Sequence, residues 1–293
     1  MMDARAIVLA LGGKWYGRYG LCRCPAHGDR KPSLSVSDGA DGRLLAKCFV
    51  GCSFPDIAAS LRGLGLIEGG GAFVAPDPAA IAQREALERA EAAKRASQAE
   101  RLWQETQPIA GSPAEAYLRG RAIVGPLPAS LRFHSACWHQ TAQRVPAMVA
   151  RLEGADGFAV HRTYLKPDGS GKAEVAPPKA MLGAVAGGAV RLTEGHGALA
   201  VAEGIETALS LSCGLLSAPS AIWAALSASG MAGLRLPPNP SRLTIASDGD
   251  KAGREAANAL AARADALGWA VSILPAPEGA DWNDVLTGKA VLA

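Results

Sequence analysis

The strongest constraint on the fold lies between residues 192 and 293, where short apolar runs alternate with amphipathic segments. Runs of this length and character predict buried strands, and the segments between them predict helices. We expect strands at 198–202, 221–226, 242–247 and 270–274, and helices at 206–213, 252–267 and 282–286. This alternation predicts a parallel sheet with helices on its faces, which is an α/β architecture.

Carboxylates follow directly on two of the expected strands. Glu203 comes after the first strand, and Asp248 and Asp250 come after the third. Because parallel strands deliver their carboxyl ends to the same edge of a sheet, these side chains should converge. Converging carboxylates repel one another, and one of them would hold a proton unless a cation were bound. Mg²⁺ or Mn²⁺ suits such a site, since it prefers oxygen ligands and keeps waters that substrate phosphates can replace.

One further acidic motif, Asp281-Trp-Asn-Asp284, leaves two interpretations open. Asp281 would complete the shell of a second metal ion, or it would cap the last helix through its carboxylate.

Cysteines near the N-terminus supply a second constraint. Four of the six cysteines lie within the first 52 residues, close to a histidine, which in a reducing compartment favours metal binding over disulfides. The pairs Cys24-Pro-Ala-His27 and Cys48-Phe-Val-Gly-Cys52 suit a tetrahedral, structural zinc ion. Cys22 is a rival to Cys24, which we prefer because its spacing from His27 suits a turn that points both side chains at one ion.

Composition excludes several classes of protein. Hydrophobic residues make up 49% of the chain and charged residues 19%, which predicts a globular protein with a buried core. The net charge of +3 permits binding to a polyanion without arguing for it. No apolar run has the length of a membrane span, and residues 1–11 are too short and too charged for a signal peptide, so we expect a cytoplasmic location. No phosphate-binding loop of a helicase motor is present in the sequence.

Two motifs resemble known families. The stretch from Cys24-Pro-Ala-His27 to Pro32-Ser-Leu-Ser-Val36 closely resembles the CHC2-like zinc-binding module of bacterial DnaG-type and phage primases. The common form of that module has two residues within the second cysteine pair, whereas this chain has three. The pattern of a strand with Glu203-Gly, then a strand with Asp248-Gly-Asp-Lys-Ala-Gly-Arg, resembles the Toprim domain, in the form found in primases.

The sequence and the resemblance together imply a division of the chain and a function. Composition and turn signals predict a linker and long helix at 68–110, in which the helix at 79–107 has only sparse apolar positions, and a basic mixed α/β subdomain at 111–191. Within that subdomain we expect a short helix at 113–119 and a hairpin of strands at 147–152 and 157–164. On either side of these regions, the resemblance implies a zinc-binding module at 1–67 and a Toprim domain at 192–293. It implies a DNA primase that copies single-stranded DNA into short RNA primers from nucleoside triphosphates, by metal-dependent nucleotidyl transfer. The short chain without a motor suggests a phage or mobile element that borrows a helicase in trans.

The resemblance also assigns roles to residues. Glu203 would be a catalytic acid or base close to the metal, and Asp248 and Asp250 would be metal ligands. Basic side chains of the middle region would hold template or nucleotide phosphates, and the candidates are Arg162, Lys172 and Lys179.

One position departs from the family pattern. Many replicative primases carry an Asp four residues after the first Glu, where this chain has Thr207, with Glu206 one position away. The resemblance therefore leaves open whether Glu206 joins the metal site.

Two other functions use the same features. A Toprim nuclease would direct the same carboxylates at a water nucleophile and would need no module for reading a start site. A non-catalytic accessory protein would bind single-stranded DNA through the zinc module and the basic middle region. A topoisomerase is disfavoured, because its nucleophilic tyrosine belongs to a much larger gate.

Overall fold

The structure is a computed structural model, and it describes residues 3–16, 19–39, 43–67, 78–195, 197–216 and 220–290. For residues 78–81, 84 and 85 it describes the backbone alone. The chain divides into two compact units, Met1–Pro78 and Ala79–Ala293. Residues 68–77, the first part of the predicted linker, lie outside the described residues, and the predicted domain boundaries stay predictions. No helix in the described ranges is both long enough and apolar enough to cross a membrane.

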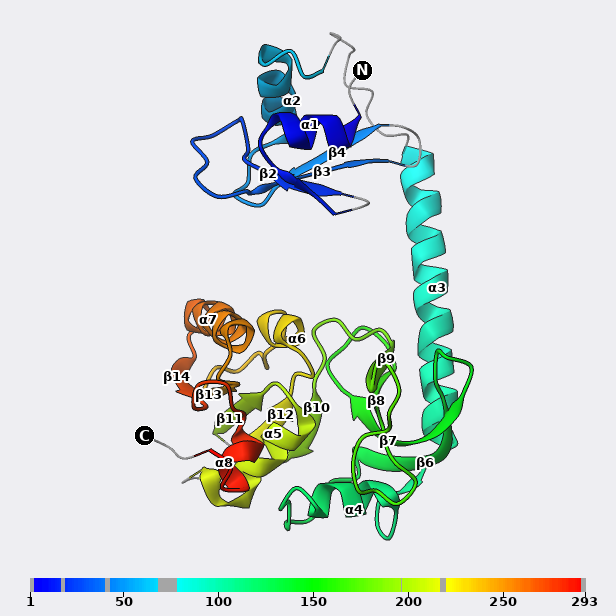
Figure 1. Cartoon of the computed structure of the whole chain (residues 1–293). Helices are drawn as coiled ribbons and strands as arrows, with labels where there is room; N and C mark the ends of the chain where they lie inside the picture. The colour runs from blue at the N-terminus through cyan, green and yellow to red at the C-terminus, as the bar shows by residue number, and fades with distance from the viewer. Residues whose placement is uncertain are drawn as a thin grey trace. The chain divides into compact units, whose positions relative to one another are not determined.

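The first unit is a four-stranded antiparallel sheet with two helices (Figure 1). Its strands, in spatial order, are β1 (Lys14–Trp15), β2 (Gly20–Cys22), β3 (Leu34–Asp38) and β4 (Leu44–Cys48). Side chains alternate along β3, so that Leu34 and Val36 enter the core. Helices α1 (Ala4–Ala10) and α2 (Phe54–Gly63) pack apolar side chains into the same cluster, and their N-termini are capped by Asp3 and Ser53.

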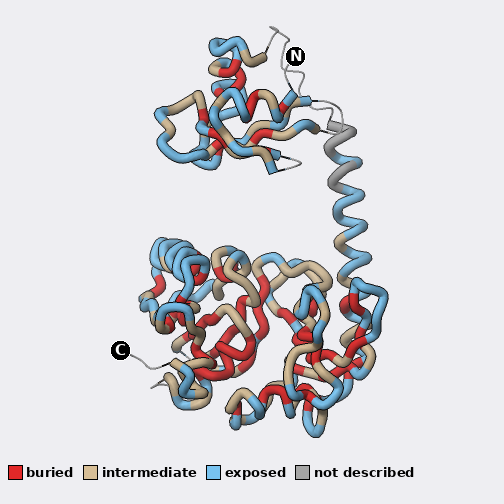
Figure 2. Tube along the Cα trace, viewed as in Figure 1, coloured by how far each residue is buried: buried red, intermediate tan, exposed pale blue. Residues whose placement is uncertain are grey.

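A long helix opens the second unit. Helix α3 (Pro78–Gln104) corresponds to the helix predicted at 79–107, and most of its described side chains are exposed (Figure 2). Near its C-terminal end, the fully buried Ala99, with Leu102 and Trp103, packs against one face of an antiparallel sheet. The helix is therefore anchored by its last turns, as the sparse apolar positions of its sequence predict.

That sheet has five strands in sequential order: β5 (Gln107–Pro108), β6 (Leu131–Trp138), β7 (Arg144–Leu152), β8 (Ala159–Tyr164) and β9 (Lys179–Gly183). The predicted hairpin corresponds to β7 and β8. The short helix α4 (Pro113–Arg119) lies where the sequence predicts it, with Ser112 as its N-cap.

The C-terminal sheet also has five strands. Its spatial order is β10 (Val190–Thr193), β12 (Ala221–Ala224), β11 (Ala198–Ala202), β13 (Arg242–Ser247) and β14 (Ala270–Pro275). The four strands predicted there are present and parallel. The sheet is mixed rather than purely parallel, because β10 joins its edge in the antiparallel direction. An antiparallel edge strand is a common addition to parallel sheets of this kind.

Helices cover both faces of this sheet. Helices α6 (Ala228–Ala232) and α7 (Lys251–Ala266) pack on one face. Helices α5 (Ile205–Ser210) and α8 (Trp282–Leu286) lie on the other, in a hydrophobic cluster that also contains side chains of α4, β6 and β7. The two sheets of the second unit therefore share one core. Helix α5 ends at Ser210 instead of the predicted Cys213, and a π-helical turn follows, in which Gly214 has a φ of 100°.

Candidate functional site

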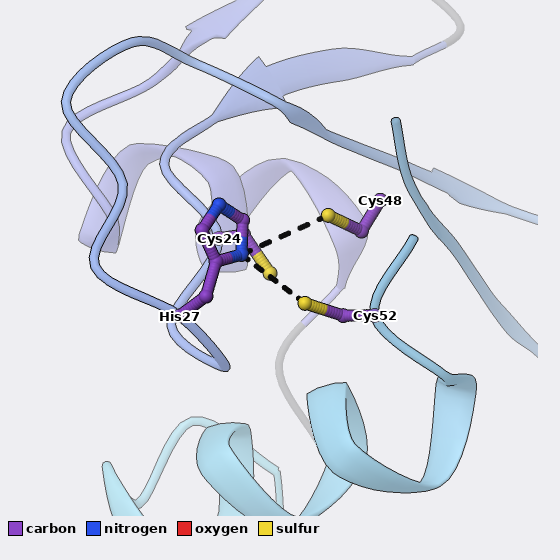
Figure 3. A group of neighbouring side chains, drawn as sticks. All are labelled: Cys24, His27, Cys48 and Cys52. Carbon is purple, nitrogen blue, oxygen red and sulfur yellow. Dashed lines mark hydrogen bonds between the residues drawn. The ribbon is translucent and has the colours of Figure 1, made fainter. Parts of the chain in front are cut away.

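Four side chains of the first unit gather at one point (Figure 3). Cys24 and His27 lie in the segment after β2, Cys48 ends β4, and Cys52 directly precedes the cap of α2. The ligand atoms of these four residues all lie within 4.8 Å of one another. The Nδ1 atom of His27 is 3.1 Å from the Sγ atom of Cys52 and 3.9 Å from that of Cys48.

This geometry fits a zinc ion. Tetrahedral zinc with ordinary Zn–S and Zn–N bonds separates its ligand atoms by roughly 3.5–3.8 Å, and the His27 distances of 3.1 and 3.9 Å straddle that range. Burial raises the pKa of the Cys24 thiol to about 12. Burial acts the same way on Cys48, but hydrogen bonds from Cys52, Val50 and Ser33 outweigh it and lower its pKa to about 6. A cation would let all three thiols ionise together.

Asp29 braces the loop that carries two of these ligands. Its Oδ2 atom accepts hydrogen bonds from the backbone N–H of Cys24, at 2.8 Å, and from the Ser33 hydroxyl, at 2.6 Å. The Nε2 atom of His27, on the far side of the ring from the thiols, is 3.8 Å from Oδ1. The Ser33 and Cys24 hydrogen bonds lower the pKa of Asp29 to about 2. A carboxylate behind a histidine ligand is the usual second partner in zinc sites.

Cys22 stands apart from the cluster. It is fully buried in the core of the unit, and its Sγ atom donates to the carbonyl oxygen of Leu34 at 3.7 Å. Burial raises its pKa to about 11. Cys22, the alternative to Cys24 as a zinc ligand, is thus a core side chain of β2.

The acidic residues of the second unit meet at one edge of the parallel sheet. Strands β11 and β13 are adjacent and parallel, with Ala202 opposite Ala246, so Glu203 and Asp248 both emerge at the carboxyl end. Asp250 is the N-cap of α7, where its side chain accepts from the backbone N–H of Gly253 at 2.7 Å.

A second loop brings Asp281 to the same edge. A Cβ atom at Gly249 would collide with the carbonyl oxygen of Pro277, so only glycine lets the two loops touch. The backbone N–H of Gly249 donates to Ala280 at 2.8 Å. Asp281 caps α8 and forms a capping box with Asp284. Asp281 also raises the pKa of Asp248, so its carboxylate acts on the edge while it caps the helix.

The charges at this edge repel one another. Burial, followed by repulsion from Glu203, Asp281 and Asp250, raises the pKa of Asp248 to about 7. Burial and Asp250 likewise raise the pKa of Glu203. The Oδ1 atom of Asp248 is buried and has no hydrogen-bond partner within the protein. A buried carboxylate oxygen without a donor, beside other carboxylates, fits a divalent cation.

The carboxylates are less tightly gathered than the cysteine cluster. Among the described residues, the Cys24, His27, Cys48 and Cys52 group is the only one in which three or more Cys, His, Asp or Glu side chains are placed to hold an ion by themselves. Mg²⁺ commonly binds to one or two carboxylates and completes its shell with waters and substrate phosphates. The acidic edge has the donors for that kind of site.

Two of the three predicted basic residues lie beside Glu206, and one of them, Lys179, also acts on this edge. Lys179 begins β9, and Lys172 follows the glycine-rich turn after β8. Their ammonium groups lie 3.2 and 3.9 Å from the carboxylate of Glu206, on α5. Lys179 also lowers the pKa of Glu203 and of Asp248 and so offsets part of their rise.

The third predicted basic residue has a different environment. The guanidinium of Arg162 donates to the carbonyl oxygens of Trp138, at 3.1 Å, and Met181, at 3.3 Å. It also lies over the ring of Tyr164. Arg162 braces strands β6, β8 and β9, and its predicted contact with phosphate stays a prediction.

Three further residues of the sites carry no local sequence signal. Tyr117 donates to Glu206 from a position 89 residues away, at 2.7 Å. His161 is buried, and burial lowers its pKa to about 3, so the ring is neutral. Asp29 stands inside the zinc-module motif, but its position in the sequence does not show that it braces the ligand loop. Contacts between distant elements place the first two, and no spacing rule reveals them.

Comparison with known proteins identifies a class for part of this chain. Residues 198–290 match the family model described as a Toprim domain, and residues 93–192 match a model described as a domain of unknown function, DUF7146. The second unit therefore ends in a Toprim domain, and the first unit adds a Cys/His cluster of zinc-site geometry. No curated protein matches the chain.

Solved primase structures are similar to the chain at low identity. One is a DNA primase domain from Pseudomonas aeruginosa, at 18% identity over 62% of this chain and 70% of that one, with a TM-score of 0.36. The zinc-binding and RNA polymerase domains of the Aquifex aeolicus primase share 14% identity over 98% and 80% of the two chains, with a TM-score of 0.36. The RNA polymerase domain of the Mycobacterium tuberculosis primase DnaG shares 16% sequence identity over 66% of this chain and 77% of that one, with a TM-score of 0.34.

The predicted architecture is confirmed. The chain has a Toprim parallel-sheet domain, a mixed α/β region before it and an N-terminal module with a zinc-like Cys/His cluster. The predicted resemblance to Toprim primases with a zinc-binding module is also confirmed, by the match to the Toprim model and by the Cys/His cluster.

Proposed function

We propose that this chain is a DNA primase that synthesises short RNA primers on single-stranded DNA. The observation that carries the proposal is the pairing of a Toprim acidic edge with two lysines from the preceding region. The Cys/His cluster in a separate unit adds the second part that a primase needs. A Toprim nuclease would use the acidic edge and would have no evident need for the zinc module.

The residues of the edge divide the chemistry among them. Asp248, Asp250 and Asp281 would hold Mg²⁺ or Mn²⁺, which when bound would acidify the attacking hydroxyl and offset charge on the phosphates. Glu203 would accept the proton of the primer 3′-hydroxyl as that oxygen attacks the α-phosphate of a nucleoside triphosphate. Burial and Asp250 raise the pKa of Glu203, which makes it a stronger base than an ordinary glutamate.

The lysines complete the site on its positive side. Lys172 and Lys179 would bind the triphosphate, and their side chains are about one-third exposed, at 33% and 34%. Ammonium groups at that position would neutralise the phosphates that face the metal and hold the leaving pyrophosphate.

The first unit would bind the template. Residues 1–67 contain nine Lys and Arg against five Asp and Glu, a net charge of +4. The whole chain has a net charge of +3, so the remaining residues together carry −1. A positive surface on a small, zinc-stabilised module suits the phosphate backbone of single-stranded DNA. We also propose a replicative helicase as a partner in trans, and a pulldown from replicating cells that recovers none would count against that partner.

Product analysis separates primase from nuclease. The wild-type protein and Asp248→Ala would be incubated with Mg²⁺ or Mn²⁺, end-labelled single-stranded templates and labelled ribonucleotides. A primase yields short new products that are absent with Asp248→Ala, while the template stays intact. Shortened template without new product would identify a nuclease, and binding without either product would identify an accessory protein.

A further inference from the structure

Glu206 is the most completely enclosed charge near the site. Its side chain is 6% exposed, and both of its carboxylate oxygens have partners in the protein. Oε1 accepts from the Tyr117 hydroxyl at 2.7 Å and lies 3.9 Å from the Lys172 ammonium. Oε2 accepts from the Lys179 ammonium at 3.2 Å. A carboxylate engaged in this way has little capacity left to hold a metal ion.

The electrostatics agree with this geometry. Burial alone would raise the pKa of Glu206, but Lys179 and Lys172 outweigh burial and lower it to about 2. The four carboxylates of the edge show no such pairing with lysine among the hydrogen bonds and ion pairs of the described residues. Glu206 therefore belongs with the basic cluster, although it lies only three positions after Glu203 in the sequence.

The Glu206 carboxylate offsets the repulsion between the two lysine ammonium groups. Repulsion from Lys179 adds to burial in lowering the pKa of Lys172. The neutral, buried His161, on whose pKa both lysines act, contributes no compensating charge. One carboxylate between two ammonium groups leaves a net charge of +1, carried by side chains that are partly open to solvent.

The network also joins two regions of the second unit. The lysines and Tyr117 come from residues 93–192, whereas Glu206 comes from the Toprim domain at 198–290. The ion pairs thus hold β9 and the segment around Lys172 in a fixed position relative to the Toprim domain. A buried, hydrogen-bonded network of this kind specifies one arrangement of its members.

We propose that Glu206 is a positioning residue that holds Lys172 and Lys179 beside the acidic edge as a preformed site for the phosphates of a nucleotide. It is not a ligand of the catalytic metal. The identity of the ligand as a nucleoside triphosphate rests on the proposed function, whereas the position of the lysines does not.

Binding measurements on the full zinc-loaded chain test this proposal. The probes are ATP, followed by calorimetry, and Mn²⁺ alone, followed by electron paramagnetic resonance. The variants are Glu206→Gln, which keeps the shape and removes the charge, and Asp248→Asn, which alters the acidic edge. Glu255→Gln is the matched control, because Glu255 is an exposed glutamate of α7 whose nearest ion-pair partner is Lys251. Thermal melts establish that each variant is folded.

The proposal predicts opposite patterns for the two sites. Glu206→Gln should weaken ATP binding by about tenfold, since two charge-assisted contacts lose their fixed geometry. It should leave the Mn²⁺ dissociation constant within about twofold of wild type, while Asp248→Asn weakens Mn²⁺ binding and Glu255→Gln changes neither. If Glu206→Gln does not fold, Tyr117→Phe removes one hydrogen bond from Glu206 and should weaken ATP binding by a smaller factor in the same direction.

Three results would overturn the proposal. Glu206→Gln that weakens Mn²⁺ binding as strongly as Asp248→Asn would make Glu206 a metal ligand. Unchanged binding of both probes would make the network purely structural. Wild-type protein that binds no ATP would remove the phosphate site itself. Because none of these measurements requires primer synthesis, loss of ATP affinity in Glu206→Gln would stand even if the chain made no primers.

Discussion

Glu203 and Asp248 leave adjacent parallel strands at the same edge of the sheet, and the charge of Glu203 raises the pKa of Asp248. Ala202 and Ala246, which precede them, are register partners of β11 and β13. Glu203 is the largest charge contribution to the raised pKa of Asp248, after burial. The sheet edge is therefore under electrostatic strain that a divalent cation would relieve.

A dependence of stability on pH follows from Asp248. Its folded pKa of about 7 lies above the ordinary value of 3.8, so the folded chain holds a proton that the unfolded chain releases. The associated stability is fully present below about pH 4 and is lost as pH rises through 7, by at most about 4 kcal/mol. In magnesium-free buffer, the melting temperature should fall between pH 5 and pH 8, and Mg²⁺ should restore it at pH 8. Asp248→Asn should flatten this dependence, and an equally steep fall in that variant would contradict the assignment.

Zinc content should distinguish Cys24 from Cys22. Cys24→Ala removes one of the four clustered ligands and should leave the purified protein with a small fraction of the roughly one equivalent expected for the wild type. Cys22→Ala removes an equally buried thiol that lies outside the cluster, so the zinc content of this variant should match wild type. Metal analysis by mass spectrometry measures both. Zinc loss in Cys22→Ala with retention in Cys24→Ala would reverse the assignment.

Asp29 should strengthen zinc binding although it is not itself a ligand. Asp29→Asn weakens acceptance from the Cys24 N–H and the Ser33 hydroxyl and removes the carboxylate beside His27. Zinc affinity should fall by about 10- to 100-fold, as for other carboxylates that support metal ligands. Competition with a chromogenic chelator measures the affinity. Asp38→Asn is a suitable control, since the Asp38 carboxylate accepts from the backbone N–H of Ala4 and not from the ligand loop. A loss of affinity as large as that of Asp29→Asn would argue against a specific role for Asp29.

Two variants of Asp281 separate its cap from its charge. Asp281→Ala removes the cap of α8 and should cost about 1 kcal/mol of stability. Asp281→Ser keeps a good capping residue, so its melting temperature should stay close to wild type, but it removes the carboxylate from the acidic edge. The Mg²⁺ concentration required for half-maximal activity should rise in both variants. An unchanged requirement in Asp281→Ser would leave Asp281 as a cap alone.

Much of the catalytic sheet follows from the sequence. Strands β11, β12 and β13 are buried over most of their length, so they appear in the sequence as short apolar runs, and acids follow two of them, β11 and β13. The caps Ser112 and Asp281 define the starts of α4 and α8, and both helices span the predicted residues. Local signals of this kind are strong because burial and capping act on consecutive residues.

The tertiary contacts do not follow from the sequence. Strand β10 has no acid and no long apolar run, and it joins the sheet beside β12 rather than beside its sequence neighbour β11. The pairing of Glu206 with Lys179 and Tyr117 spans 27 and 89 residues. Sequence spacing placed Glu206 near the metal site, but only the packing of α5 against the preceding region shows which charges it meets.

Two variants of the second unit test whether the acidic edge catalyses primer synthesis. Asp248→Asn would be compared with Asp265→Asn, an exposed position of α7, for the formation of short labelled RNA on single-stranded DNA with Mn²⁺ or Mg²⁺. Asp248→Asn should lower the rate at least about 100-fold relative to wild type, because it removes a proposed metal ligand. Asp265→Asn should keep the full rate. Equal rates for Asp248→Asn and wild type, or no primer from wild type on any template, would contradict a primase function of this edge.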